Sequence, residues 1–92
     1  MKMKIYFLDN GFAYIGTGYL VNSKIYGKSL RIKNALNLRV WGTTNKGLGV
    51  LAIEGKQKET IVDFCGIVDV PIGRVFHVIH MTDSAMKSFK DA

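Results

Sequence analysis

The most distinctive group of chemically useful side chains lies in residues 39–47, where the chain reads Arg-Val-Trp-Gly-Thr-Thr-Asn-Lys-Gly. Arginine and lysine bind phosphate, threonine hydroxyls donate hydrogen bonds, and a nucleobase can stack on tryptophan, which is worth about 1–3 kcal/mol per base. A helix that begins after the threonines would add free N–H groups, which favour an anion. We therefore predict an anion-binding site formed by Arg39, Trp41, Thr43, Thr44 and Lys46. The alternative is structural, because threonine is an ordinary N-cap residue and the single tryptophan of a small domain commonly lies in the core.

A second basic group lies just upstream, in the alternating segment 29–33. Leu30 and Ile32 point to one side of a predicted strand, so Arg31 and Lys33 point to the other. If this strand neighbours the one that holds Arg39, the outward faces merge into a basic stripe that ends at Trp41. The tyrosines that border such a stripe, on faces that the sequence leaves open, are Tyr14, Tyr19 and Tyr26. Interleaved basic and aromatic residues favour a nucleotide or nucleic acid, and they also fit an acidic protein surface.

The net charge belongs to one part of the chain. Thirteen basic and seven acidic residues among 92 give a formal charge of +6. Between Asp9 and Glu54 there are six basic residues and no acidic one, and the remaining seven bases and seven acids cancel. This one-sided distribution favours an anionic partner. The alternative is a solvated surface that only maintains solubility.

Residue types suited to catalysis or metal binding are few. His77 and His80 lie on one predicted strand, and their separation of three residues sends them to opposite faces, so each is predicted to be a packed or partly buried structural histidine. Asp63 and Asp69 are expected to point outward, with a carboxylate pair as the alternative if a turn at Cys65-Gly66 brings their strands together. One cysteine excludes a disulfide framework within the chain. Nucleophile elbow, Walker loop, zinc and dinucleotide patterns are all absent. We predict a protein that is not an enzyme, with no catalytic residue, metal site or cofactor.

The elements that must position these residues are mostly short strands. Ten glycines and one proline punctuate the sequence, and Asn10-Gly11 is a strong hairpin signal. Gly16 and Gly18 predict a bulge or bend, and Cys65-Gly66 predicts a turn. The strands that we expect cover residues 4–9, 12–15, 19–21, 29–33, 36–41, 60–64, 67–71 and 75–81, the last of them central in the sheet.

Two helices are predicted beside these strands. One covers roughly residues 45–54, with Thr43 or Thr44 as its N-cap and Gly55 after its end. The other begins at Thr82-Asp83-Ser84 and runs to about Phe89. The expected fold is a single domain over residues 1–92, mainly β (α+β). It is a small antiparallel β-barrel or strongly curved sheet of six to eight short strands, with one short inserted helix and a short C-terminal helix.

Several segments resemble a known group of sequences. The runs Leu30-Arg31-Ile32-Lys33-Asn34-Ala35, Arg39-Val40-Trp41-Gly42-Thr43-Thr44 and Gly47-Leu48-Gly49, with Gly11-Phe12 upstream and Val70-Pro71-Ile72 downstream, resemble a family of small uncharacterised proteins encoded by tailed bacteriophages and prophages. The resemblance covers most of the chain but includes no catalytic motif. It implies an accessory phage protein in the host bacterial cytoplasm, where such proteins commonly serve counter-defence or host takeover by binding.

The leading hypothesis is a non-catalytic phage binding protein that captures an anionic ligand, either a nucleotide-type signalling molecule or a nucleic-acid element. The ligand-binding residues would be Arg31, Lys33, Arg39, Trp41, Thr43, Thr44 and Lys46. The alternatives are an inhibitor that docks its basic face on an acidic, nucleic-acid-binding surface of a host defence enzyme, and a direct nucleic-acid-binding module. A domain this small forms a fuller pocket between subunits, so we expect a homo-oligomer. No apolar run approaches the roughly 18 residues that span a bilayer, so we expect no membrane partner.

Overall fold

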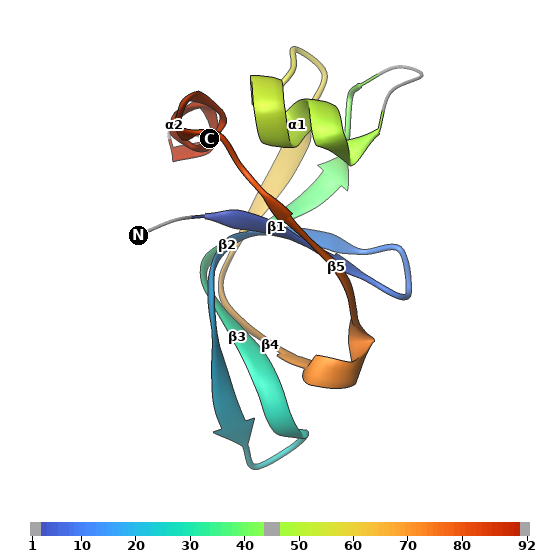
Figure 1. Ribbon diagram of the computed structural model, residues 1–92, viewed down its shortest axis with the longest axis vertical. Coiled ribbons are helices and arrows are strands. Elements are labelled where there is room, and N and C mark those ends of the chain that lie inside the picture. The colour runs from blue at the N-terminus through green and yellow to red at the C-terminus, as the bar shows by residue number, and fades with distance from the viewer. Residues whose placement is uncertain (1–2, 44–46, 91–92) are drawn as a thin grey trace.

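One antiparallel, strongly curved sheet dominates the protein (Figure 1). The computed structural model describes residues 3–43 and 47–90, and in that part of the chain five strands lie in the order β4-β3-β2-β1-β5. In chain order the elements are β1 (Lys4–Leu8), β2 (Ala13–Ser23), β3 (Gly27–Val40), α1 (Leu48–Glu54), β4 (Ile61–Pro71), the 3-10 helix η1 (Ile72–Arg74), β5 (Val75–His80) and α2 (Asp83–Lys90). The mainly β class is confirmed. Of the two expected architectures, the strongly curved sheet fits the structure, and the barrel is wrong because the sheet does not close. The expected six to eight strands are also wrong, since the sheet has five strands among the described residues, and η1 adds a helical segment beyond the two predicted helices.

The strand count is lower because three expected breaks are bulges within continuous strands. Segments 12–15 and 19–21 both belong to β2. Segments 29–33 and 36–41 are the two halves of β3, joined through Asn34, whose φ is 51°. Segments 60–64 and 67–71 are likewise joined within β4 through Gly66, whose φ is 77°. The cross-strand register shifts at both places. A residue with positive φ inserts an extra position without ending the strand, so the turn predicted at Cys65-Gly66 is wrong.

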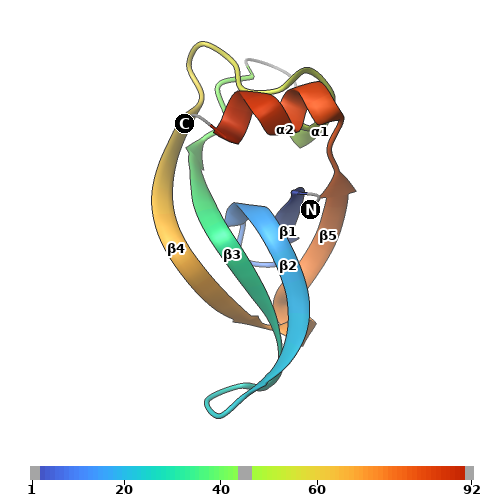
Figure 2. The same ribbon diagram turned by 90° about the vertical axis from the view of Figure 1, so that its left-hand side faces the viewer.

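The bulge in β3 lets one strand contribute to two cores. Leu36 and Leu38 pack in what we call the helix-side core, between the sheet and the two α-helices, whereas Leu30 and Ile32 pack in the strand-side core on the other face. Strict alternation would place all four leucine and isoleucine side chains on one face. The extra position at Asn34 therefore exchanges the faces. Figure 2 shows α1 and α2 together across one end of the curved sheet.

Glycines in β2 allow the close approach that this curvature requires. The predicted bulge is confirmed, because the register of β2 against β3 shifts between Ile15 and Thr17. A Cβ on Gly16 would lie 2.6 Å from Cγ2 of Ile32 and 2.7 Å from the backbone oxygen of Lys33. A side chain at residue 16 would therefore force Ile32 or the backbone of β3 to move.

Local predictions at the ends of the elements had mixed outcomes. The hairpin at Asn10-Gly11 is confirmed, with Gly11 at φ 91° and the amide of Phe12 donating to Oδ1 of Asn10 at 3.0 Å. The amide of Ala85 donates to Oγ1 of Thr82 at 3.2 Å, as expected for the N-cap of α2. The α1 prediction is wrong at its start, because the helix begins at Leu48 after the N-cap Gly47. In the described part of the chain, neither α-helix is long and apolar enough to cross a membrane.

The last strand also lies elsewhere than predicted. Residues 75–81 were expected at the centre of the sheet, because both faces of the segment carry apolar side chains. Instead β5 is an edge strand that pairs only with β1 among the described residues. Its exposed apolar side chains are Phe76 and Val78.

We expect Gly16→Ala to destabilise the fold by about 1–3 kcal/mol, because the added methyl group must displace Ile32 and the backbone of β3. Gly49→Ala is the matched control, since a Cβ there meets nothing within 4 Å and alanine favours a helix over glycine by up to about 1 kcal/mol. Chemical denaturation followed by circular dichroism measures both changes. Equal stability of the two variants would contradict the close packing at Gly16.

Candidate functional site

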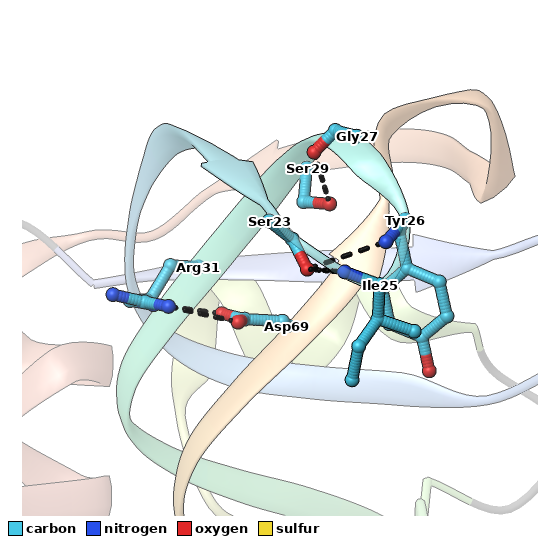
Figure 3. Close-up of polar contacts among 7 residues, drawn as sticks. All are labelled: Ser23, Ile25, Tyr26, Gly27, Ser29, Arg31 and Asp69. Carbon is cyan, nitrogen blue, oxygen red and sulfur yellow. Dashed lines mark hydrogen bonds and ion pairs between the residues drawn. The ribbon is translucent and has the colours of Figure 1, made fainter.

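Both arginines of the predicted site form ion pairs with aspartates of β4. Nε and Nη2 of Arg31 donate to the two carboxylate oxygens of Asp69 at 2.8 and 2.9 Å (Figure 3). Nε of Arg39 donates to Oδ2 of Asp63 at 2.8 Å. Arg31 and Asp69 are direct cross-strand neighbours. Residues 10–53 include no acidic residue, but in the fold their two arginines lie beside acidic residues of β4. These ion pairs are consistent with the expected outward orientation of Asp63 and Asp69.

The two-bond geometry binds Arg31 firmly to its partner. Hydrogen bonds from the guanidinium are the main cause that lowers the pKa of the Asp69 carboxyl, and the same hydrogen bonds raise the pKa of Arg31. A planar guanidinium matches a carboxylate in this paired arrangement. Arg31 is therefore a poor candidate for binding an external anion.

The predicted basic stripe is interrupted. It required the strands of Arg31 and Arg39 to be neighbours, and these segments are successive halves of β3. Because the bulge at Asn34 exchanges the faces, Arg31 and Arg39 project from opposite sides of the sheet. Lys33 lies near Arg31, with its Nζ 5.7 Å from the centre of the Tyr19 ring, within the range of a cation–π contact.

A cavity of about 350 Å³ brings Arg39 and Trp41 together. It lies where the β1–β2 turn approaches the end of β3, and its lining residues are Gly11, Phe12, Asn37, Leu38, Arg39 and Trp41. This volume lies in the range of small-molecule sites, which are about 300–1,000 Å³. Sequence reasoning missed Phe12, which is 51% exposed and adds a second aromatic wall. The cavity thus combines two aromatic side chains, an amide and a guanidinium.

Trp41 serves both the cavity and the core. Its ring lies edge-on to Phe7, with centroids 6.2 Å apart and planes at 72°, and it packs against the helix-side core. Its backbone oxygen accepts a hydrogen bond from Oγ1 of the buried Thr60 at 2.7 Å. Gly42 follows with φ 70°, and a Cβ there would lie 2.4 Å from the backbone of residues 59 and 60. These contacts hold the indole and the main chain around it in place. Trp41 therefore packs in the core, as the structural interpretation predicts, and also lines a cavity where a base could stack, as the functional interpretation predicts.

The remaining predicted residues contribute less to this geometry. Thr43 lies within the described chain, whereas Thr44 and Lys46 lie outside the described residues. Since α1 has seven residues and its N-cap is Gly47, the helix N-terminus predicted after the threonines does not follow them directly. That part of the anion-site prediction loses its basis.

A larger cavity of about 510 Å³ lies beneath α2 and was not predicted. Its lining residues are Met3, Gly16, Thr17, Asn34, Leu36, Phe64, Phe89 and Lys90. The bulges of β2 and β3 form one side of it, and α2 forms the other. The sequence signals for this cavity are the bulge-forming residues Gly16 and Asn34. The cavity could not be predicted from them alone, because its walls come from segments far apart in the chain.

The histidines differ from the prediction. His77 and His80 are both exposed instead of packed. The ring of His77 stacks on Phe7, with centroids 6.1 Å apart, and it lies 4.3 Å from the ring of Phe76. Within residues 3–43 and 47–90, no group of three histidine, cysteine or acidic side chains is placed to hold a metal ion.

Comparisons with known proteins add no relative: a scan against protein-family models and searches of curated proteins and of solved structures found no match to this chain.

We expect Asp69→Asn to lower the Tm at neutral pH, because the amide cannot form the charged pair with Arg31. Arg31 lowers the pKa of the Asp69 carboxyl in the folded protein. The ion pair therefore stabilises the fold fully above the pKa of Asp69 in the unfolded chain, about 3.9, and this stabilisation is lost as the pH falls through the lower pKa of the folded state. The difference in Tm from the unmodified protein should therefore shrink below about pH 4. Thermal unfolding across the acid range measures it. Asp9→Asn, which removes a more exposed pair with Arg74, is the control with a smaller expected loss, and an unchanged Tm for Asp69→Asn at neutral pH would contradict the argument.

Proposed function

We propose that the protein is a non-catalytic binding protein that captures a nucleotide-type anionic ligand in the cavity beside Arg39. The observation that carries the proposal is the convergence of Phe12, Arg39 and Trp41 on one cavity of about 350 Å³. Aromatic faces and a guanidinium suit a base and a phosphate, respectively.

Four of the six lining residues have a role in this proposal. The base stacks against Phe12 and Trp41, and the amide of Asn37, which both donates and accepts, faces the edge of the base. Arg39 binds the phosphate. Its present partner, Asp63, competes only weakly, because the two side chains are 59% and 45% exposed and exposed ion pairs contribute little.

The biological setting stays a prediction from the sequence resemblance. A phage accessory protein in the bacterial cytoplasm that binds a signalling nucleotide without turnover would lower the free concentration of that signal and so counter a defence response. Lys33, Thr43, Thr44 and Lys46 are further candidates for phosphate contacts. Arg31 is a weaker one, since its Nε and Nη2 atoms already donate to Asp69.

Trp41 makes the test direct, because it is the only tryptophan in the chain. We expect one member of a panel of cyclic and linear nucleotides to quench its fluorescence and raise the Tm. Arg39→Ala should weaken that binding about tenfold or more, since a hydrogen bond to a charged group is worth about 1.5–3 kcal/mol. Asp63→Asn should strengthen it, because the competing carboxylate is removed. Titration calorimetry measures both changes.

Arg74→Ala is the matched control, because this exposed arginine pairs with Asp9 and does not line the cavity. It should leave the affinity unchanged. The proposal fails if no nucleotide in the panel changes the fluorescence or the Tm. It also fails if Arg39→Ala binds as tightly as the unmodified protein.

The β2–β3 hairpin favours a second candidate function, an inhibitor that docks on an acidic surface of a host defence enzyme. Its end carries exposed apolar side chains, with Leu20 at 63%, Ile25 at 82% and Tyr26 at 51% exposure. Lys24 and Lys28 flank them, and no acidic residue occurs in this part of the sequence. Replacing both lysines with glutamate should abolish capture of the enzyme and leave the tryptophan response to nucleotides unchanged.

A further inference from the structure

We propose that the protein forms a homodimer in which β4 of one copy pairs with β4 of a second copy, antiparallel, across a two-fold axis near the middle of the strand. The two sheets then become one continuous sheet. This assembly surface is independent of the nucleotide proposal, since it rests on β4 and not on the cavity beside Arg39.

The first argument is the nature of the edge. β4 is eleven residues long and lies at one end of the strand order, so one side of its backbone has no strand partner among the described residues. Edge strands are normally protected by lysine, by proline or by a covering segment. Residues 59–73 contain no lysine or arginine, and the one proline, Pro71, lies at the end of the strand. The protective feature that the strand does have is the bulge at Gly66, so the two regular halves of the edge, residues 61–64 and 67–70, are the parts open to pairing with another strand.

The second argument is the exposure of large apolar side chains on both faces of this strand. Ile61, Phe64 and Ile67 are 41%, 73% and 63% exposed. Phe64 lines the cavity beneath α2. Ile61 precedes Val62, which packs against the helix-side core, so it points to the opposite face. A partner that rests on one face would leave the other uncovered, whereas a strand placed alongside covers both.

The third argument identifies the occupant as a second copy. An antiparallel pair of identical strands is self-complementary and closes as a dimer. The acidic side chains on this strand do not oppose it, because Asp63 and Asp69 are paired with arginines of β3. β5, the other edge, has six residues, and pairing β4 with β5 of another copy would be head-to-tail and would not close as a dimer.

Light scattering after size exclusion tests the assembly. We expect a concentration-dependent dimer, and Ile67→Lys should raise its dissociation constant at least about tenfold by placing a charge on the paired edge. Ile25→Lys is the matched control, because Ile25 is even more exposed, at 82%, but lies in the β2–β3 turn. It should leave the dimer intact.

Cys65 provides a second measurement that uses the unmodified chain. It is exposed, is the only cysteine and lies beside the midpoint of β4. Opposed residues in an antiparallel pair have Cα atoms about 4.5–5.5 Å apart, so a short bis-maleimide should link two copies in dilute solution. Cys65→Ser should abolish the link, and Ile25→Cys in the Cys65→Ser background should not restore it.

The outcomes separate clearly. A dimer that Ile67→Lys weakens, or that links through Cys65 if that variant fails to fold, supports the proposal. A monomer at every accessible concentration overturns it, as does a larger open assembly. A dimer that Ile67→Lys leaves unchanged and that does not link through Cys65 also overturns it. All of these measurements are made without added nucleotide, so failure of the dimer proposal is distinguishable from failure of the nucleotide proposal.

Discussion

Bulges on three adjacent strands determine how this chain builds its interior. These three bulges lie at Gly16 in β2, Asn34 in β3 and Gly66 in β4, and the register places Thr17 opposite Lys33 and Ala35 opposite Gly66. They therefore lie side by side across the sheet. Because each bulge exchanges the inward and outward positions of its strand, the same strands supply apolar side chains to a core on either face. A small domain buries limited surface, and this arrangement gives one sheet two cores.

The same register changes the meaning of the net charge. The formal charge of +6 arises between Asp9 and Glu54, but β4 places Asp69 and Asp63 beside the two arginines of that segment. A charge distribution along the sequence therefore overstates the field at the folded surface, since oppositely charged side chains far apart in the chain neutralise each other. The other basic residues of β3, Lys28 and Lys33, are lysines without an ion pair to an acidic side chain of the described chain, and lysines bind phosphate as point charges without the paired geometry of arginine.

Local signals in the sequence predicted local structure well. The pair Asn10-Gly11 indicates a hairpin, and Thr82 indicates the N-cap of a helix, from residues adjacent in the sequence alone. Both features are present in the structure. At Asn34 and Gly66 the same kind of signal, a residue that tolerates positive φ, produces a bulge. Only the neighbouring strand distinguishes a bulge from a turn, and that information is not local. The candidate site shows the same limit: Arg39 and Trp41 lie two residues apart, whereas Phe12 joins them through the pairing of Tyr14 with Asn37.

The Arg39–Asp63 ion pair connects the proposed ligand site with the proposed dimer edge. Asp63 lies on β4 beside Phe64, and Arg39 lines the cavity. In the proposed dimer the two-fold axis lies near residue 66, so Asp63 of one copy lies opposite Asp69 of the other. A phosphate that takes Arg39 leaves the Asp63 carboxylate without its counter-charge, and it then faces a second carboxylate across the strand pair. Like charges across a strand pair destabilise it. If both proposals hold, ligand binding and dimerisation oppose each other, and because coupling is reciprocal, the dimer must bind the ligand more weakly than the monomer by the same factor.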